Sequence, residues 1–348
     1  MSSRTVEASR LRELCSALLQ VQGVGPGDAD FVASTIVEAD LRGTHSHGCV
    51  RLPRYIRELA GKITNPTPSI RILDEGPAFA RIDGDGGLGP LVGRYAMEQC
   101  MAKARQAGSA TVTAAGSRHF GAAGYYALMA EAEGLIGLCM TVASPRLAPT
   151  GGTQPLFGNN PLAMAVPSNQ DFSLLVDFAS GSIAAGRLEL AAANGTAIPA
   201  GVARDLEGNP TTDPAVAHRG TIVPIGEHKG YGLTMLIEIL AGLLGGAPYF
   251  GVEREQTGDH VRDKGIGHFF MALDPARFMP LETFKASVDH MVGGTKNSKR
   301  MPGVDEIFLP GEQEARRRRQ YSQDGIPLDD STLKTLAGLA ADAGVDPL

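Results

Sequence analysis

The sequence predicts a mixed α/β protein made of two lobes. The chain has 348 residues, 43% of them hydrophobic, so it is long and apolar enough to bury a large core. Apolar residues recur at helical spacing near both ends, and several short apolar runs typical of strands lie between them. We therefore expect a strand-rich middle, with the C-terminal tail folded back on helices at the N-terminus.

The N-terminal region predicts two helices joined by a turn. The first helix is marked by four apolar residues at helical spacing: Leu11, Leu14, Leu18 and Val21. Gly23 follows as a stop signal. Residues 28–41 carry the pattern of a second helix, which ends before Gly43.

The rest of the chain alternates predicted strands and helices. Strands are expected at residues 79–83, 110–114, 136–143, 162–167, 172–178 and 266–273. Helices are expected at residues 91–106, 122–133, 229–244, 281–291, 312–320 and 330–343. The most apolar stretch, residues 231–247, contains Glu238 and is interrupted by glycines. A membrane span needs about 20 apolar residues, so a buried helix is favoured here.

Composition argues against several classes of protein. The formal net charge of −6 is unlike that of a general nucleic-acid binder, whose affinity depends on surplus Lys and Arg. The first 12 residues are polar and charged, so they do not resemble a secretory signal. The four cysteines are far apart and form no CxxC pair, which favours reduced thiols. We expect a cytoplasmic protein that binds neither nucleic acid nor membranes.

Glycine is about twice as frequent as usual, at 44 of 348 residues, yet it forms no familiar nucleotide fingerprint. Residues 23–27 imitate a G-x-G-x-x-G loop, but they follow a helix and contain Pro26, which favours a helix–helix turn. Residues 84–89 follow a strand but lack the spacing, so a tight turn is expected. An ordinary Rossmann fingerprint is therefore absent, and any nucleotide would need a different cradle.

The segment around Ser46, His47 and Arg51 has the composition of a catalytic site. If Ser46 caps a helix, His47 and Arg51 lie four residues apart on one face. Arg would then bind a substrate carboxylate as a fork while His exchanges a proton. Pro53 argues against a helix that begins before His47. A capping Ser with solvated His and Arg is an equally weighted alternative.

His45 and His47 alternate along the chain and would share one face of an extended segment. A metal site needs a third or fourth ligand, and no His, Cys or Asp with suitable spacing lies nearby. We therefore predict no metal site in this protein.

Two glycine-containing turns are candidate binding loops. Residues 116–124 connect a predicted strand to a helix rich in small residues, whose exposed N–H groups form a natural anion site. His119 in this loop is either a cofactor contact or a core histidine. Asn159 and Asn160 precede Pro161 in a polar, rigid turn that has either a binding or a purely structural role.

Two further segments carry charge at the ends of predicted elements. Asp177 follows an apolar strand and either accepts ribose hydroxyls or caps the next element. His228 and Lys229 open a long helix, where the positive helix end suits a phosphate, although a solvated Lys in a glycine turn is as plausible. The four-arginine run at residues 316–319 favours a solvated helix face.

Taken in order, these motifs resemble one family from residue 6 to residue 344. The matching residues are Ser46-His47-Gly48, Arg51, Tyr55, His119-Phe120-Gly121-Ala122-Ala123-Gly124, Gly158, Asn160-Pro161, Asp177, His228-Lys229-Gly230-Tyr231-Gly232, Glu238 and Pro310-Gly311-Glu312. Each match alone is weak, but the ordered set is specific. The sequence resembles the type 2 malate/L-lactate/L-sulfolactate dehydrogenase family. That family also includes ureidoglycolate dehydrogenase, 2,3-diketo-L-gulonate reductase and Δ1-piperideine-2-carboxylate reductase.

The resemblance implies a non-Rossmann α/β fold. Its NAD(P)-binding sheet would be mostly antiparallel and seven-stranded, and both termini would build a helical lobe. Residues 1–75 together with 305–348 would form the helical substrate lobe, and residues 76–304 the NAD(P)-binding and dimerisation region. A homodimer with active sites near the subunit interface is also implied.

The resemblance also assigns roles to individual residues. His47, with Ser46, would be the catalytic proton donor and acceptor, and Arg51 and Asn159 would bind the substrate. The cofactor, NAD or NADP, would be lined by His119, Phe120, Gly121, Ala122, Ala123, Asp177, Phe178, Ala179, His228, Lys229, Gly311 and Glu312.

The implied reaction is hydride transfer between the nicotinamide and C2 of a small 2-hydroxy or 2-oxo carboxylic acid, such as malate, lactate or sulfolactate. The alternative is NADPH-dependent reduction of a cyclic 2-carboxy imine. Two departures from the family bear on this choice. Asn159 stands where many members have Thr next to the substrate, and Arg187 stands where the imine reductases have Asp. A cofactor-binding protein without catalysis is a third reading, disfavoured because His47 and Arg51 are both present.

Overall fold

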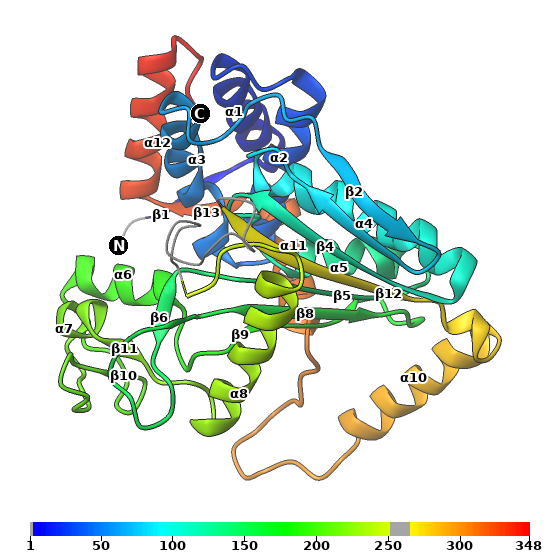
Figure 1. Cartoon of the computed structure of the whole chain (residues 1–348). Coiled ribbons are helices and arrows are strands. Elements are labelled where there is room, and N and C mark those ends of the chain that lie inside the picture. Colours follow the sequence, from blue (N-terminus) through cyan, green and yellow to red (C-terminus); the bar gives the residue numbers. More distant parts are fainter. Residues whose placement is uncertain (1–2, 251–264) are drawn as a thin grey trace.

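The computed structural model describes residues 3–250 and 265–348. Helices from the two ends of the chain form one helical layer beside a large sheet, as Figure 1 shows by the neighbouring blue and red ribbons. The helices of this layer are α1 (Ala8–Val21), α2 (Pro26–Leu41), α3 (Leu52–Ala60) and α12 (Asp330–Ala343).

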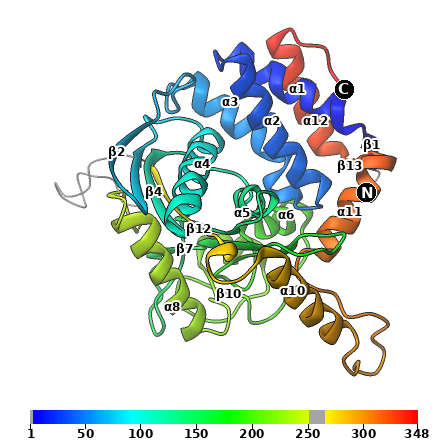
Figure 2. The same ribbon diagram turned by 90° about the vertical axis from the view of Figure 1, so that its right-hand side faces the viewer.

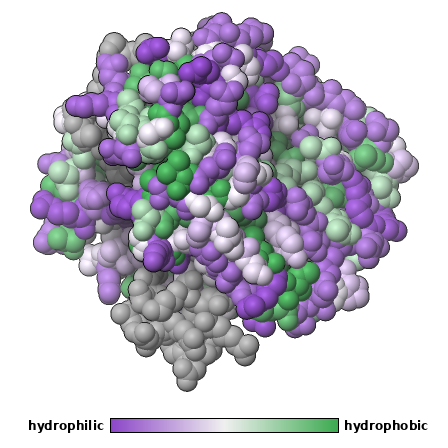
Figure 3. Space-filling model, turned by 90° about the horizontal axis from the view of Figure 1, so that it is seen from above, coloured by the Kyte–Doolittle hydropathy of each residue, from purple (hydrophilic) through white to green (hydrophobic). Residues whose placement is uncertain are grey.

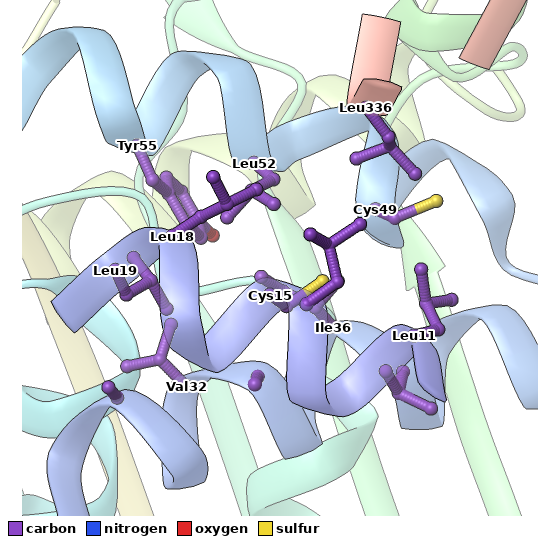
Figure 4. Close-up of a cluster of buried hydrophobic side chains, with 14 of the residues drawn as sticks. Leu11, Cys15, Leu18, Leu19, Val32, Ile36, Cys49, Leu52, Tyr55 and Leu336 are labelled. Atoms are coloured by element: carbon purple, nitrogen blue, oxygen red, sulfur yellow. The ribbon is translucent and has the colours of Figure 1, made fainter. Parts of the chain in front are cut away.

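The two ends of the chain are joined by a short antiparallel pair of strands. Strand β1 (Ser3–Val6) pairs with β13 (Ile326–Asp329), which leads into α12. The apolar stripe at Leu11, Leu14 and Leu18 packs against side chains of the other helices, including Leu336 from α12 (Figure 4). This packing confirms that the tail folds back on the N-terminal helices.

The central sheet has the strand order β2-β3-β4-β12-β5-β8-β9. Its strands are β2 (Arg71–Gly76), β3 (Phe79–Asp83), β4 (Ser109–Ser117), β5 (Ile136–Thr141), β8 (Pro161–Val166), β9 (Leu174–Ala179) and β12 (Ile266–Leu273). Among these pairings β3 and β4 run parallel, and the others are antiparallel. The structure therefore confirms the seven-stranded, mostly antiparallel sheet. Strand β2 crosses the boundary proposed at residues 75/76, and the two-region division stays a prediction.

Helices cover both faces of this sheet because its central strands are apolar on both sides (Figure 1 and Figure 2). On β12, Phe270 faces the cluster formed with α4 (Gly89–Ala107) and α5 (Gly124–Ala132). Its neighbour Phe269 faces the opposite cluster, which includes Ile237 of α8 (His228–Ile237).

A smaller sheet lies to one side, with the strand order β10-β11-β6-β7. Its strands are β6 (Pro145–Leu147), β7 (Phe157–Gly158), β10 (Ala203–Arg204) and β11 (Thr221–Ile222), accompanied by α6 (Ala185–Asn194) and α7 (Pro214–Arg219). The sequence predicted none of these elements. Helix α10 (Leu281–Lys296) lies at the periphery in both ribbon views, and α11 (Glu312–Asp324) leads back to β13 (Figure 1 and Figure 2).

Among the predicted boundaries that differ from the structure, two lie close to segments with candidate site residues. The helix expected at residues 229–244 is α-helical only to Ile237 and continues as a π-helix over Glu238–Leu243. The strand expected from residue 172 begins at Leu174. The conditional helix from Ser46 through Arg51 is not formed, in line with the argument from Pro53, because two 3₁₀ turns occupy His45–His47 and Cys49–Arg51.

The two glycine-rich turns are confirmed as turns. Residues 22–25 connect α1 to α2, and residues 84–87 form a tight turn in which Asp85 and Gly86 have φ angles of 51° and 67°. Hydrophilic residues cover much of the face seen from above, with hydrophobic residues scattered among them (Figure 3). Within the described residues, no helix is both long and apolar enough to cross a membrane.

Candidate active site

The central feature of the site is the segment between α2 and α3, residues 44–51, which we name the His47 turn. Pro53 occupies the first turn of α3, where its missing N–H costs no helical hydrogen bond, so the helix begins at Leu52. The Ser46 hydroxyl lies 3.0 Å from Nδ1 of His47, and the Ser46 carbonyl accepts a 2.6 Å hydrogen bond from Nε of Arg51. Ser46 therefore joins the imidazole and the guanidinium without a continuous helix.

His119, from a distant part of the sequence, stacks on His47. Their ring centroids are 5.6 Å apart and the rings are inclined by 15°. The Tyr55 hydroxyl on α3 lies 2.9 Å from Nδ1 of His119, and the Gly121 N–H points to the same nitrogen at 3.4 Å. Because an N–H can only donate, Nδ1 is the acceptor, and neutral His119 carries its proton on Nε2.

Both histidines are neutral near pH 7. Burial lowers the pKa of His47 to about 4, and the positive charge of Arg51 adds to the effect. Burial also lowers the pKa of His119 well below its ordinary value, with smaller contributions from His47 and Arg51. A neutral His47 is ready to accept a proton.

The loop that carries His119 connects β4 to α5. Phe120 is buried between the rings of His268, at a centroid distance of 4.5 Å, and Tyr126, at 4.8 Å. Gly121 has a φ angle of 82°, and a Cβ placed there would meet no atom within 4 Å. The packing of Phe120 thus anchors the loop. The space beside Gly121 is free, so a ligand can approach the backbone there.

Asp177 on β9 holds the start of α5. Its Oδ2 accepts a 2.8 Å hydrogen bond from the Gly124 N–H, and a Cβ on Gly124 would lie 2.7 Å from that oxygen. Surrounding protein raises the pKa of Asp177 to about 6, although the Gly124 bond opposes the shift. Solvent reaches this carboxylate, so screening weakens the shift. Asp177 thus binds the start of an earlier helix rather than the element that follows it, and its predicted contact with the ribose stays a prediction.

The two ends of β9 contact other segments predicted to line a cofactor. A Cβ at Gly311 would lie 2.5 Å from the Ser173 carbonyl oxygen, so the Gly311 backbone lies directly on β9. The Ser180 carbonyl accepts a 2.9 Å hydrogen bond from the Ile225 N–H, close before α8, where His228 and Lys229 are exposed. The Gly311 segment therefore lies beside the beginning of β9, and the segments near residues 124 and 225 lie beside its end.

Glu312, also predicted to line the cofactor, is directed into the protein. It is 3% exposed, and its carboxylate binds Lys296 at 2.7 Å, Arg316 at 2.8 Å and the Leu309 N–H at 3.2 Å. The arginine run is likewise in ion pairs, since Arg318 binds Glu38 at 2.8 Å. It is more than a solvated helix face.

The side chain of Asn159 supports a neighbouring loop. Its Oδ1 accepts a 2.7 Å hydrogen bond from the Gly181 N–H, and its Nδ2 donates to the Ile183 carbonyl at 3.0 Å. Both ends of the amide are thus used within the protein, and direct substrate contact by Asn159 stays a prediction. Next to it, buried Asn160 donates to Oε1 of Glu238 at 3.3 Å.

The first turn of α6 lies against the His47 turn. A Cβ on Gly186 would stand 3.1 Å from Cβ of Ser46 and 3.4 Å from Nη2 of Arg51. The neighbouring Arg187 is exposed. Sequence reasoning singled out Arg187 but missed the contact made by Gly186, because α6 was not predicted.

Two buried side chains next to the site also escaped sequence reasoning. Asp40 is fully buried under the His47 turn, and His268 is fully buried under Phe120. The available signal was a polar residue within an apolar helix or strand, which alone does not specify a partner. Over residues 3–250 and 265–348, no group of three or more His, Cys, Asp or Glu is arranged to hold a metal ion.

Comparison with known proteins identifies the family. The family model described as malate/L-lactate dehydrogenase matches residues 6–337. The chain is 38% identical to the malate dehydrogenase of Pyrococcus horikoshii, over 99% of this chain and 96% of that protein. It is 39% identical to the L-sulfolactate dehydrogenase of Methanocaldococcus jannaschii, over 96% of each.

Solved structures agree with the sequence comparison. The structure of the Pyrococcus horikoshii malate dehydrogenase superposes with a TM-score of 0.90 at 36% identity, covering 99% of this chain and 97% of that one. The structure of Δ1-piperideine-2-carboxylate reductase from Pseudomonas syringae superposes with a TM-score of 0.84 at 29% identity, covering 97% and 100%. The chain belongs to the malate/L-lactate dehydrogenase family and is a dehydrogenase that acts on a CH–OH group with NAD(P).

Proposed function

We propose that this dehydrogenase transfers a hydride between the nicotinamide and C2 of a small 2-hydroxy or 2-oxo carboxylic acid of the malate, sulfolactate or lactate type. The observation that carries the proposal is the pairing of His47 and Arg51 through Ser46, with bonds of 3.0 and 2.6 Å. A guanidinium beside an imidazole fits a carboxylate whose neighbouring carbon bears an oxygen.

Arg51 would bind the substrate carboxylate. Its Nε is already bonded to the Ser46 carbonyl, which fixes the plane of the guanidinium and leaves its terminal N–H groups for an anion. The close approach of Gly186 on α6 limits the space on the Nη2 side. This favours a small acid over a bulky one.

His47 would move the proton at the C2 oxygen. In oxidation, neutral His47 accepts the hydroxyl proton as the hydride leaves C2, and in reduction it returns the proton to the carbonyl oxygen. In the free enzyme, the pKa of His47 is lowered to about 4 by burial and by Arg51. A bound carboxylate would offset the charge of Arg51, which raises the pKa of His47 toward neutrality.

The residues around β9 suit a dinucleotide. The nicotinamide supplies the hydride acceptor or donor, and the protein holds and orients it. Gly121 offers open space beside His119, Asp177 is reached by solvent, and His228 and Lys229 are exposed at the start of α8. We assign cofactor contacts to His119, Phe120, Gly121, Ala122, Ala123, Asp177, Phe178, Ala179, His228, Lys229, Gly311 and Glu312. Phe120 and Glu312 are buried, so their part is to hold the backbone in place.

We further propose that the protein is a cytoplasmic homodimer. The helical segment that begins with α8 exposes a row of large apolar side chains on its outer side: Leu236, Ile239, Leu243 and Leu244. An exposed apolar patch of this kind is typical of a surface that another protein covers. All four cysteines are buried, free thiols, as expected in a reducing compartment.

Reduction of a cyclic 2-carboxy imine is the second candidate. The fold similarity to Δ1-piperideine-2-carboxylate reductase favours it, and its substrate also carries a carboxylate for Arg51. The exposed Arg187, in place of an acidic residue, argues against it. Only a direct comparison of substrates separates the two.

The decisive experiment measures the oxidation of NADH and NADPH with a panel of substrates. We expect turnover with at least one of oxaloacetate, pyruvate, sulfopyruvate and 2-oxoglutarate, and much less with Δ1-piperideine-2-carboxylate. His47→Ala should abolish most of the turnover of the acid, whereas His290→Ala, at an exposed position on α10, should leave it unchanged. Preferred turnover of the imine would support the second candidate, and failure with every substrate would refute both.

A further inference from the structure

Asp40 is a fully buried carboxylate in the last turn of α2, directly under the His47 turn. This is an unfavourable place for a negative charge. The C-terminal end of a helix carries partial negative charge, and burial removes the stabilisation that water would give. A carboxylate that persists in such a position needs strong partners.

The partners of Asp40 come from both sides of Ser46 and His47. Oδ1 lies 2.8 Å from Nδ1 of His45, and Oδ2 accepts a 2.7 Å hydrogen bond from the Cys49 N–H. Because a carboxylate only accepts, Nδ1 of His45 carries the proton. The two oxygens of one side chain thus hold the beginning and the end of the segment that contains the proposed proton donor.

The carboxylate of Asp40 lies so close to the backbone of residue 48 that only glycine fits there. A Cβ built on Gly48 would overlap the carboxylate of Asp40. The Cys49 side chain beyond it is fully buried among Leu11, Ile36 and Leu52 of the helical core (Figure 4). His45 is anchored on its other side as well, since its ring stacks on Tyr321 of α11 at a centroid distance of 6.2 Å.

The alternatives for a buried acid do not fit these contacts. Within the described residues, Asp40 belongs to no group of three or more His, Cys, Asp or Glu that could hold a metal ion. Both of its oxygens are engaged by protein donors, which leaves it poorly placed to exchange a proton with substrate. Both of these hydrogen bonds go to the turn that carries Ser46, His47 and Arg51.

We propose that Asp40 is a positioning residue, which fixes the His47 turn through His45 and Cys49 and thereby aligns His47 with Arg51 and His119. The inference rests on the proposed function for the role of His47. An error of about 1 Å in the position of a catalytic group costs on the order of a hundredfold in rate, so such a support has a measurable effect.

The test compares Asp40→Ala with Asp40→Asn and with Asp30→Ala. Asp30 lies on the same helix but is exposed and paired with Arg12, so its loss controls for a change in α2 alone. In Asp40→Asn, the amide oxygen can accept from Cys49, and its NH₂ can donate to His45 once that ring moves its proton to Nε2. We expect Asp40→Ala to lower kcat/KM for the acid by about a hundredfold. Asp40→Asn should restore most of this loss, and Asp30→Ala should match the parent.

Two further readouts separate positioning from a general loss of structure. The Kd for NADH, measured by fluorescence, should stay within twofold in all three variants. If Asp40→Ala does not fold, His45→Ala removes one of the two contacts at a partly exposed side chain and should lower kcat/KM by about tenfold. Wild-type kcat/KM in the folded Asp40→Ala or His45→Ala protein would overturn the proposal. So would an Asp40→Asn variant as impaired as Asp40→Ala.

A spectroscopic measurement keeps this test independent of the substrate. In ¹⁵N-histidine spectra, the His47 signals should shift in Asp40→Ala and not in Asp30→Ala, and His45 should change tautomer in Asp40→Asn. If the parent protein reduces no acid in the panel, the proposed function fails, but these spectra still decide whether Asp40 orders the turn. Unchanged His47 signals in Asp40→Ala would refute the inference by themselves.

Discussion

The imidazole rings of His47 and His119 are stacked with their centroids 5.6 Å apart, although 71 positions separate the two residues in the sequence. One ring is tied to Ser46 and the other to Tyr55, so each is held by a separate hydrogen bond. The stack joins the helical layer, which supplies His47, to the loop at the end of the sheet, which supplies His119. This contact is where the proposed substrate and cofactor residues meet.

The first prediction separates proton transfer from carboxylate binding. His47→Ala should lower kcat by about 10²- to 10⁴-fold, the usual contribution of a general acid or base. Arg51→Lys keeps the positive charge but loses the planar fork, so it should chiefly raise KM for the acid, by about tenfold or more. Steady-state kinetics at saturating NADH measures both effects.

Arg57→Lys is the matched control for the arginine substitution, because Arg57 is exposed on α3 and has no assigned role in the site. It should leave KM and kcat unchanged. Near-normal activity in His47→Ala would remove His47 from the chemistry and direct attention to His119.

The second prediction concerns Tyr55. Its ring is buried in the helical core, and its hydroxyl meets Nδ1 of His119 at 2.9 Å. Tyr55→Phe keeps the packing but removes this bond, so Nδ1 of His119 retains only the longer contact from the Gly121 N–H and the ring is held less firmly. A hydrogen bond of this kind contributes about 0.5–1.5 kcal/mol, and we expect kcat/KM to fall by about tenfold.

Tyr95→Phe on α4 removes a hydroxyl far along the chain from the site and should have no such effect on kcat/KM. Thermal unfolding of both variants provides the check on stability. If Tyr55→Phe loses stability but retains the parent kcat/KM, the hydroxyl serves the fold and not His119.

Sequence periodicity was sufficient to predict the larger helices and strands, because their apolar residues recur at the spacing that places them on a buried face. The stripe at Leu11, Leu14 and Leu18 faces one core, and the strand at Ile266–Leu273 alternates Phe269 and Phe270 between two cores. The small sheet escaped prediction because strands such as Thr221–Ile222 have too few residues to show any alternation. The π-helix over Glu238–Leu243 escaped because its apolar pattern resembles that of an α-helix.

The site was predictable in residue type but not in geometry. His47, Arg51 and His119 stood out as reactive groups near glycines, and the structure brings them together. Substrate contact by Asn159 stays a prediction, but the bonds of its amide to the backbone of Gly181 and Ile183 were not predictable. The orientation of an amide depends on which backbone groups surround it, and those come from a loop that the sequence gives no reason to place there.

The third prediction uses the contact between α6 and the His47 turn. In Gly186→Ala, the new methyl group would stand 3.1 Å from Cβ of Ser46, which is tighter than most packing contacts, and would touch Nη2 of Arg51 at 3.4 Å. We expect KM for the acid to rise by several-fold, with the Kd for NADH changed less. Kinetics and fluorescence titration measure the two quantities.

Gly338→Ala on α12 is the matched control, because a Cβ there meets no atom within 4 Å. Replacing a helical glycine by alanine in open space stabilises a protein by about 0.5–1 kcal/mol. This variant should therefore unfold at a slightly higher temperature and remain fully active. Equal KM values in the two variants would show that α6 does not limit the substrate site.

The fourth prediction is the pH dependence of the two reaction directions. The pKa of His47 in the free enzyme is lowered to about 4, so His47 is neutral throughout the neutral range. Oxidation needs the neutral ring, and its kcat/KM should therefore stay level from neutral pH down to about pH 5 before it falls. Reduction needs the protonated ring, and its kcat/KM should rise as pH falls, by about tenfold per unit, until the pH nears this pKa.

Asp177 is the group most able to obscure this profile, because its pKa is raised to about 6 by the protein around it. Protonation of Asp177 would alter cofactor binding, whereas protonation of His47 alters the chemical step. The profile should therefore be measured at saturating cofactor and repeated in Asp177→Asn, where any inflection near pH 6 should disappear. An inflection near pH 6.5 that survives in Asp177→Asn would mean that His47 titrates as an ordinary exposed histidine and that burial does not control it.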